Sequence, residues 1–184
     1  VALYGDGALR AHLSEDGGAI WTAAALLAQR PGARRAGILG AGAEAVACHL
    51  LDAGLEEVMV VVRDPAWPAL LRRHAPPGPA ACLEDPRLVW CHGEGPPEGA
   101  RWDLAWLQHT DPTTAAASRF LSLESLSRIH EALARDGLLG LSISVTENVL
   151  DGPALAYARA VDATLAGVFT QVVATGGERM LFLG

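Results

Sequence analysis

Hydrophobic and polar positions along the chain follow two periods, one typical of strands and one typical of helices. Glu57 to Val62 is rich in β-branched residues, the composition of a strand buried on both faces of a sheet. Ser122 to Arg135 is the clearest amphipathic helix, and Gly137 follows it. The apolar face of this helix carries Leu123, Leu126, Ile129, His130 and Leu133. We therefore expect His130 to be a buried histidine.

The other segments continue this alternation. A hairpin is predicted for Val1 to Leu13, where Gly5-Asp6-Gly7 supplies the turn residues. Helices are predicted at residues 20–29, 43–53, 66–74 and 153–168, and Gly54 is placed to cap the second of them. Strands are predicted at residues 36–39, 88–91, 103–107, 138–145, 171–174 and 180–183. The Pro-rich segment 76–79 is expected to be a loop, and Gly176-Gly177 the last turn.

Strands that alternate with crossover helices predict a fold of the α/β class. Such units build a doubly wound, mostly parallel sheet covered on both sides, and two closing strands joined by a tight turn add an antiparallel edge. We expect an N-terminal β-hairpin at residues 1–16 and a Rossmann-like domain at residues 17–184. A chain of 184 residues, 51% of them hydrophobic, is long and apolar enough for one buried core, which excludes a disordered chain.

Charge and composition narrow the functional classes. The chain has 14 basic residues, all Arg, and 21 acidic ones, so its formal charge of −7 argues against a nucleic-acid partner. No apolar run approaches the roughly 20 residues of a membrane helix, and the N-terminus lacks a signal-peptide pattern. We expect a cytoplasmic segment without membrane contact of its own. Cys48, Cys82 and Cys91 lack metal or redox spacing and are expected to be reduced thiols.

A glycine turn follows the first strand of the predicted Rossmann-like domain. Gly40 allows a tight turn, Gly42 lets a ligand approach the backbone, and Ala45 permits close helix packing, which together fit the pattern G-x-G-x-x-A. This pattern is typical of dinucleotide-binding enzymes. A glycine turn at the same place holds the adenosyl group of S-adenosyl compounds in methyltransferase-like folds. A tight turn without a ligand is the third interpretation.

The end of the second strand carries the residues that discriminate between these ligands. Arg63, next to such a turn, is suited to the 2′-phosphate of a dinucleotide. Asp64 is suited to ribose hydroxyls, but its position before Pro65 also fits a helix N-cap.

Taken in order, the segments resemble spermidine synthases and the wider spermidine-synthase-like proteins over nearly the whole chain. Leu3 to Leu9 is similar to the opening hairpin of that family, Arg35 to Gly42 to its first strand and glycine turn, and Val61 to Pro65 to its second strand end. Further similar segments are Glu84 to Leu88, His92 to Glu94, Trp102 to Leu104, Thr110 to Pro112, Leu133 to Ser142, Thr164 to Phe169 and Met180 to Leu183. The subgroup it resembles is bacterial, with the domain often fused to membrane helices, so this chain would be part of a longer membrane protein.

The resemblance implies a fold of the class I S-adenosylmethionine-dependent methyltransferase type. It also implies decarboxylated S-adenosylmethionine or S-adenosylmethionine as co-substrate, a small amine as substrate, and no metal. Working enzymes of the family move an aminopropyl group to the amine, and a carboxylate in the active-site loop takes the proton of the amine. On this pattern Gly93 and Glu94 help to bind the adenine, and Asp111 anchors or deprotonates the amine. The free edge of the hairpin suggests a homodimer.

Several positions depart from the family pattern, among them the acidic and histidine positions before the first strand, which fall within Trp21 to Ala25. The acidic residue of the glycine turn is replaced by Ala43, although Glu44 is adjacent. The ribose-binding glutamate is replaced by Val62, and the loop aspartate that deprotonates the amine by Gln108. Loss of a general base costs roughly 10²–10⁴ in rate, so these changes predict little ordinary spermidine synthase activity.

Three hypotheses follow for the function. The first is a spermidine-synthase-like domain of altered or lost activity, the second a non-catalytic binding or assembly module, and the third an NADP-dependent oxidoreductase.

Several other side chains are interpreted as structural: Trp102 and Trp106 on one face of a strand, Cys91 packed, and Glu147 a solvated loop residue. A metal site of His92, Glu94 and His109 is a minor alternative, because no further ligand is evident.

Overall fold

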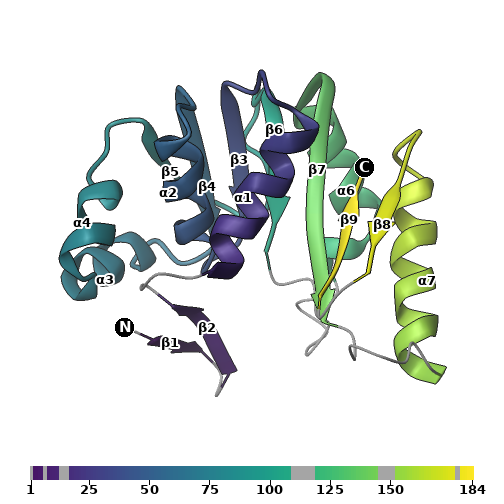
Figure 1. The fold of residues 1–184 in the computed structure, drawn as a ribbon, viewed down its shortest axis with the longest axis horizontal. Helices are drawn as coiled ribbons and strands as arrows, with labels where there is room; N and C mark the ends of the chain where they lie inside the picture. Colours follow the sequence, from purple (N-terminus) through teal and green to yellow (C-terminus); the bar gives the residue numbers. More distant parts are fainter. Residues whose placement is uncertain (1, 6–7, 13–16, 109–118, 145–151, 177–178) are drawn as a thin grey trace.

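A seven-stranded sheet forms the centre of the molecule (Figure 1). The structure is a computed structural model, and it describes residues 2–5, 8–12, 17–108, 119–144, 152–176 and 179–184. The strands of this sheet are β3 (Arg35–Leu39), β4 (Glu57–Val62), β5 (Leu88–His92), β6 (Trp102–Leu107), β7 (Leu133–Ser144), β8 (Val173–Thr175) and β9 (Arg179–Leu183). A separate antiparallel hairpin pairs β1 (Ala2–Gly5) with β2 (Ala8–His12), as the sequence predicts.

The strand order β5-β4-β3-β6-β7-β9-β8 confirms the predicted fold class. The five strands from β5 to β7 are parallel, and β9 runs antiparallel to both β7 and β8. The chain winds outward from β3 to β5 and then returns to place β6 on the other side of β3. The direction of winding therefore changes between β3 and β6, and in such sheets a crevice opens at the carboxyl ends of these two strands.

Helices cover both faces of the sheet (Figure 1). The helices are α1 (Gly17–Gln29), α2 (Glu44–Asp52), α3 (Trp67–His74), α4 (Pro77–Leu83), α6 (Leu123–Ala132) and α7 (Gly152–Ala166), with a short 3-10 turn η1 (Arg119–Leu121). Buried side chains of α1, α2 and α4 pack in one core layer, and those of α6 and α7 in the other. Within the described residues, no helix is long and apolar enough to cross a lipid bilayer.

Several boundaries follow from local chemistry that the sequence shows. The strand β4 has the predicted bounds, and Gly54 adopts the left-handed φ of 100° that a helix-ending glycine needs. Ser122 caps α6, because its hydroxyl accepts the backbone N–H of Ser125 at 3.2 Å.

Two predicted boundaries are wrong. The Pro-rich segment is not a loop but the start of α4, since proline is well tolerated in the first turn of a helix, where its missing N–H has no partner to lose. The helix α6 ends at Ala132, and β7 begins at Leu133 rather than at residue 138, because Leu133 pairs with Trp102 of β6. Residues 133–137, which local periodicity assigns to helix and turn, are therefore part of a strand because that strand pairs within the sheet.

The two tryptophans of β6 lie in different core layers, against the prediction of a shared face. The pairing of β6 with β7 is irregular between Trp102 and Leu104, which breaks the alternation of the strand. Trp102 therefore packs in the α6 and α7 layer and Trp106 in the α1 and α2 layer. Asp103, at the irregularity, accepts the backbone N–H groups of Arg34 and Arg35 at 2.8 and 2.9 Å and so fixes the start of β3.

The cysteines and His130 also differ from expectation. Cys48 of α2 and Cys82 of α4 form a disulfide across 34 residues of chain, whereas Cys91 is free. The prediction that Cys48 and Cys82 are reduced thiols is therefore wrong. Their spacing in the sequence gives no sign of pairing, which depends on the packing of the two helices that carry them. His130 is exposed, and its ring meets the edge of Phe169 at a centroid distance of 5.3 Å.

Gly37 of β3 has a strict packing role, which yields a first prediction. A Cβ at this position would lie 2.3 Å from the indole ring of Trp102, which is itself buried in the core. We expect Gly37→Ala to lower the free energy of unfolding by about 1–3 kcal/mol, because overpacking a tight core forces strain on its neighbours. Urea denaturation monitored by tryptophan fluorescence measures this loss.

Gly32→Ala is the matched control, since a Cβ there has no atom within 4 Å. Its free energy of unfolding should stay within about 0.5 kcal/mol of the parent protein. Equal stability of the two variants would contradict the packing of Trp102 on Gly37.

Candidate functional site at the carboxyl edge of the sheet

The glycine turn joins β3 to α2 at the point where the winding of the sheet reverses. Gly40 and Gly42 have φ angles of 105° and 97°, a region that other L-residues avoid. The N–H of Gly40 donates to the carbonyl of Val61 at 2.9 Å, so the turn is fixed to the end of β4. The G-x-G-x-x-A pattern thus has the backbone conformation that requires glycine.

Glu44 folds back over this turn instead of pointing into solvent. Its carboxylate oxygens accept the N–H of Gly42 at 3.1 and 3.0 Å, and the indole N–H of Trp67 donates to it at 2.5 Å. The residue is only 1% exposed. Burial raises the pKa of the Glu44 carboxyl, and the hydrogen bonds from Trp67 and the backbone oppose that rise more weakly.

This arrangement bears directly on the choice of ligand. A helix N-terminus that follows a glycine turn is an anion site, because its N–H groups point at the ligand. Here the N–H of Gly42 already donates to a side chain of the protein itself, the carboxyl group of Glu44. A pyrophosphate brought to the turn would meet that carboxylate, whereas an adenosyl sulfonium or thioether carries no phosphate.

The Glu44 contacts were not foreseen from the sequence. Glu44 was a candidate substitute for the acidic residue that the resemblance places at Ala43, and Ala43 itself is buried. The partner of Glu44, Trp67, lies 23 residues away, and no spacing or motif links the two. A glutamate two residues after Gly42, in an otherwise apolar helix face, was the only available signal.

The ends of β4 and β5 bring together the predicted adenosine-side residues. Arg63 and Glu94 form an exposed ion pair, in which Arg63 Nε donates to Glu94 Oε1 at 2.8 Å. Arg63 was predicted to bind a 2′-phosphate, and Glu94 already engages its guanidinium. Asp64 accepts the N–H of Ala66 at 2.9 Å, a contact typical of a turn. The predicted N-cap role of Asp64 is wrong, because the N-cap of α3 is Ala66, without a side-chain hydrogen bond. Val62 is buried and offers no side-chain acceptor.

Gly93 and His92 lie beside this ion pair. The N–H of Gly93 donates to the carbonyl of Val62 at 3.0 Å, and a Cβ at Gly93 would meet only the carbonyl of Gly95 at 3.7 Å. The backbone is therefore open to a ligand at Gly93. Across the described residues, no group of three or more His, Cys, Asp or Glu side chains is placed to hold a metal ion.

A small pocket of about 170 Å³ lies between α1, the glycine turn and the ends of β6 and β7. Gly18, Thr22, Gly42, Trp106, Gln108 and Ser142 are among the residues that line it. Trp106 donates its indole N–H to Gln108 Oε1 at 2.8 Å, which fixes the orientation of the Gln108 amide. Asp111, His109 and Glu147 lie outside the described residues.

Sheet and site together define the class of fold. Counted from β3, the strand order is 3-2-1-4-5-7-6 with an antiparallel last strand, and a glycine turn follows the first strand. This is the Rossmann-like fold of class I S-adenosylmethionine-dependent methyltransferases. No protein-family model and no curated protein matches the sequence.

Solved structures share this fold at low sequence identity. A spermidine synthase in complex with the transition-state analogue AdoDATO superposes with a TM-score of 0.74 and 14% identity over 100% of this chain. The spermidine synthase of Thermotoga maritima superposes with a TM-score of 0.64 and 16% identity over 95% of this chain. Human methyltransferase-like protein 13, in complex with SAH, superposes with a TM-score of 0.61 and 13% identity over 91% of this chain. The chain spans 64% and 56% of the two spermidine synthases and 77% of the human protein.

The buried Glu44 carboxyl generates a prediction about pH. Because its pKa is raised in the folded protein, the folded state binds a proton more tightly than the unfolded state does. Glu44 therefore makes stability fall as the pH rises from the ordinary value of 4.5 through the folded-state pKa. A single group contributes a slope of at most about 1.4 kcal/mol per pH unit. We expect Glu44→Gln to remove this slope from urea denaturation curves recorded between pH 4.5 and 8.

Glu98→Gln is the control for that experiment, since Glu98 is an exposed glutamate away from the turn. Its stability should follow the same pH profile as the parent protein. Parallel profiles for the parent protein and Glu44→Gln would show that the Glu44 carboxyl is not buried against Gly42 and Trp67.

Proposed function

We propose that this domain binds an adenosyl sulfonium or thioether at the carboxyl edge of its sheet and belongs functionally with the aminopropyl transferases. The observation that carries the proposal is the Glu44 carboxylate on the Gly42 N–H. It leaves the glycine turn suited to a ligand without phosphate. The similarity of the fold to a spermidine synthase in complex with a transition-state analogue supports the same ligand class.

The adenosine half of the ligand would lie across the ends of β3, β4 and β5. In this proposal Gly40 and Gly42 face the sugar and sulfur, and the open backbone at Gly93 receives the adenine. Glu94 would exchange its ion pair with Arg63 for the adenine amino group. The exchange is inexpensive, because an exposed ion pair contributes only about 0–1 kcal/mol.

The transfer half of the reaction requires a neutral amine. An ammonium has no lone pair to attack the carbon beside a sulfonium, so a base must take its proton. Gln108 cannot act as this base, because an amide does not take up a proton near neutral pH. Its side-chain oxygen already accepts a hydrogen bond from the indole N–H of Trp106. Asp111 is therefore the candidate base, with decarboxylated S-adenosylmethionine as donor and a small amine as acceptor.

A non-catalytic binding module is the second candidate. The fixed Gln108 amide and the buried Val62 remove a base and a ribose acceptor from places where the resembled enzymes have carboxylates. An NADP-dependent oxidoreductase has less support. Arg63, the residue suited to the 2′-phosphate, is paired with Glu94, and Glu44 accepts the Gly42 N–H that a phosphate would need.

Calorimetric titration tests the ligand class. The parent protein should bind methylthioadenosine or S-adenosylmethionine and not NADPH. Glu94→Gln should weaken adenosyl binding about 10- to 150-fold, the range for loss of a charged hydrogen-bond partner. Glu98→Gln is the matched control and should bind as the parent does. Binding of NADPH alone would overturn the assignment of the site.

A turnover assay separates the catalytic from the non-catalytic proposal. Decarboxylated S-adenosylmethionine is incubated with a panel of amines, and release of methylthioadenosine is measured by chromatography. We expect slow turnover that falls a further 10²–10⁴-fold, roughly, in Asp111→Asn, because that change removes the base. Adenosyl binding without product from any amine would favour the non-catalytic module.

A further inference from the structure

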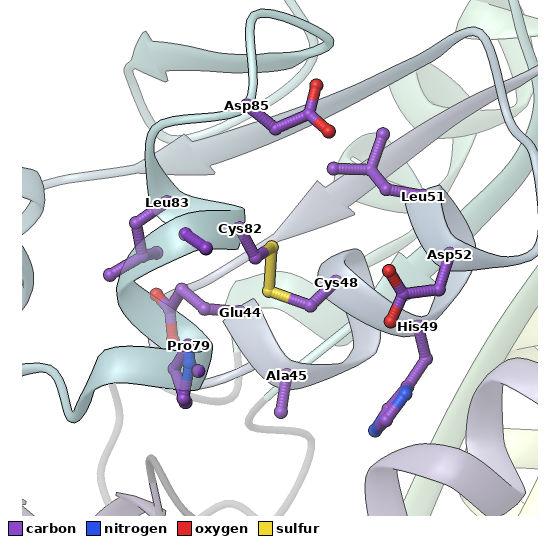
Figure 2. A pocket seen from close by; sticks show the side chains of 12 residues that line it. Glu44, Ala45, Cys48, His49, Leu51, Asp52, Pro79, Cys82, Leu83 and Asp85 are labelled. Atoms are coloured by element: carbon purple, nitrogen blue, oxygen red, sulfur yellow. A yellow bond between two sulfur atoms is a disulfide. The ribbon is translucent and has the colours of Figure 1, made fainter.

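A second pocket, of about 480 Å³, lies between α2 and α4 and shares Ala45 with the small pocket at the carboxyl edge of the sheet. The Cys48–Cys82 disulfide lines this pocket, with Glu44 on one side of it and His49 and Asp52 on the other (Figure 2). Both cysteines are partly exposed. The disulfide therefore lies where a molecule entering from solvent reaches it.

We propose that this pocket is a thiol–disulfide exchange site, and that opening the disulfide loosens the glycine turn. The thiolate of a small thiol attacks one cysteine sulfur, forms a mixed disulfide, and releases the other cysteine as a thiolate. A second molecule of thiol attacks the mixed disulfide. The products are two protein thiols and one oxidised small-molecule disulfide, so the small thiol supplies both electrons.

The helix α4 depends on the disulfide for its position. It has seven residues and begins Pro-Gly-Pro, a length far below the roughly 12–15 residues at which an isolated helix becomes stable in water. Leu83 is its one buried residue. The covalent bond to Cys48 is thus a main attachment of α4 to α2, and breaking it frees a helix with little stability of its own.

The glycine turn is connected to the same pocket through Glu44. Glu44 and Cys48 are four residues apart on α2, so they lie on one face of the helix, and both line the pocket. Trp67, which donates to Glu44, begins α3, and only Ala75 and Pro76 separate α3 from α4. Displacement of α4 would admit water to Glu44 and weaken its hold on Gly42 and Trp67.

Charge selects the kind of thiol that this pocket accepts. Asp52 and Asp85 line it, and Arg87 faces both of them, with a hydrogen bond to Asp85 and an electrostatic interaction with Asp52, so that the two carboxylates outnumber this cation. The floor is formed by apolar side chains such as Ala45, Leu51 and Leu83. A small thiol with a cationic group should therefore react faster than one with an anionic group.

The experiment treats the folded protein with cysteamine or with 2-mercaptoethanesulfonate and counts free thiols by alkylation and mass spectrometry. At low ionic strength we expect cysteamine to open the disulfide about fivefold faster, after correction for thiolate concentration, and salt to reduce the difference. Circular dichroism should show that the reduced protein stays folded. Equal rates would overturn the charge selection, and reaction only in urea would overturn the exchange site.

Hydrogen exchange of the tryptophan indole N–H groups tests the coupling and requires no bound ligand, so it is independent of the proposed function. After reduction the Trp67 indole should exchange at least tenfold faster. The Trp106 indole, held by Gln108, is the internal control and should not change. Cys91→Ser should respond as the parent does, because Cys91 is not in the disulfide.

The double variant Cys48→Ser/Cys82→Ser provides the same test without a reductant, and should show the fast Trp67 exchange permanently. An unchanged Trp67 rate in the reduced protein would refute the coupling. Global unfolding on reduction would also refute it, since the disulfide would then be a structural cross-link alone.

Discussion

The Glu44 carboxylate is the interaction on which the candidate site depends. It ties the glycine turn, the first turn of α2 and the start of α3 to one buried point, because it accepts hydrogen bonds from both Gly42 and Trp67. A carboxylate in this position is costly to bury, and those two donors offset part of the cost. The chain thus places its own carboxyl group on the N–H of Gly42 at the start of α2. The glycine turn therefore has the shape shared by many nucleotide sites, and a phosphate brought to it would compete with Glu44 for the N–H of Gly42.

Much of the fold was predictable from periodicity alone. The β-branched run of β4 and the amphipathic face of α6 are strong local signals, and the alternation of strands and helices fixes the class of fold. The errors lie where sheet pairing or tertiary packing decides. Leu133 joins β7 although its local pattern is helical, and Trp102 changes face because the pairing near Leu104 is irregular.

For the candidate site, the sequence predicted the positions of the residues at the strand ends but not the contacts between their side chains. Gly40, Gly42 and Glu94 lie at the strand ends where the motifs indicated. The pairing of Arg63 with Glu94, of Trp106 with Gln108 and of Cys48 with Cys82 was not predictable. These contacts join side chains from different elements, and they exist only after the sheet has set the distance between those elements. A sequence shows which residues end each strand but not which of them meet.

The strand order has a consequence for how the chain assembles. Because β6 returns to pair with β3, Ala36 and Leu104 become neighbours although 67 residues separate them in the chain. The cleft draws on residues as distant as Gly18 and Ser142. Contacts of such long sequence separation cost loop-closure entropy and lower the folding rate. The contacts of Glu44 with Gly42 and Trp67 span only 2 and 23 residues, so their closure costs less chain entropy than closure of the cleft beside them.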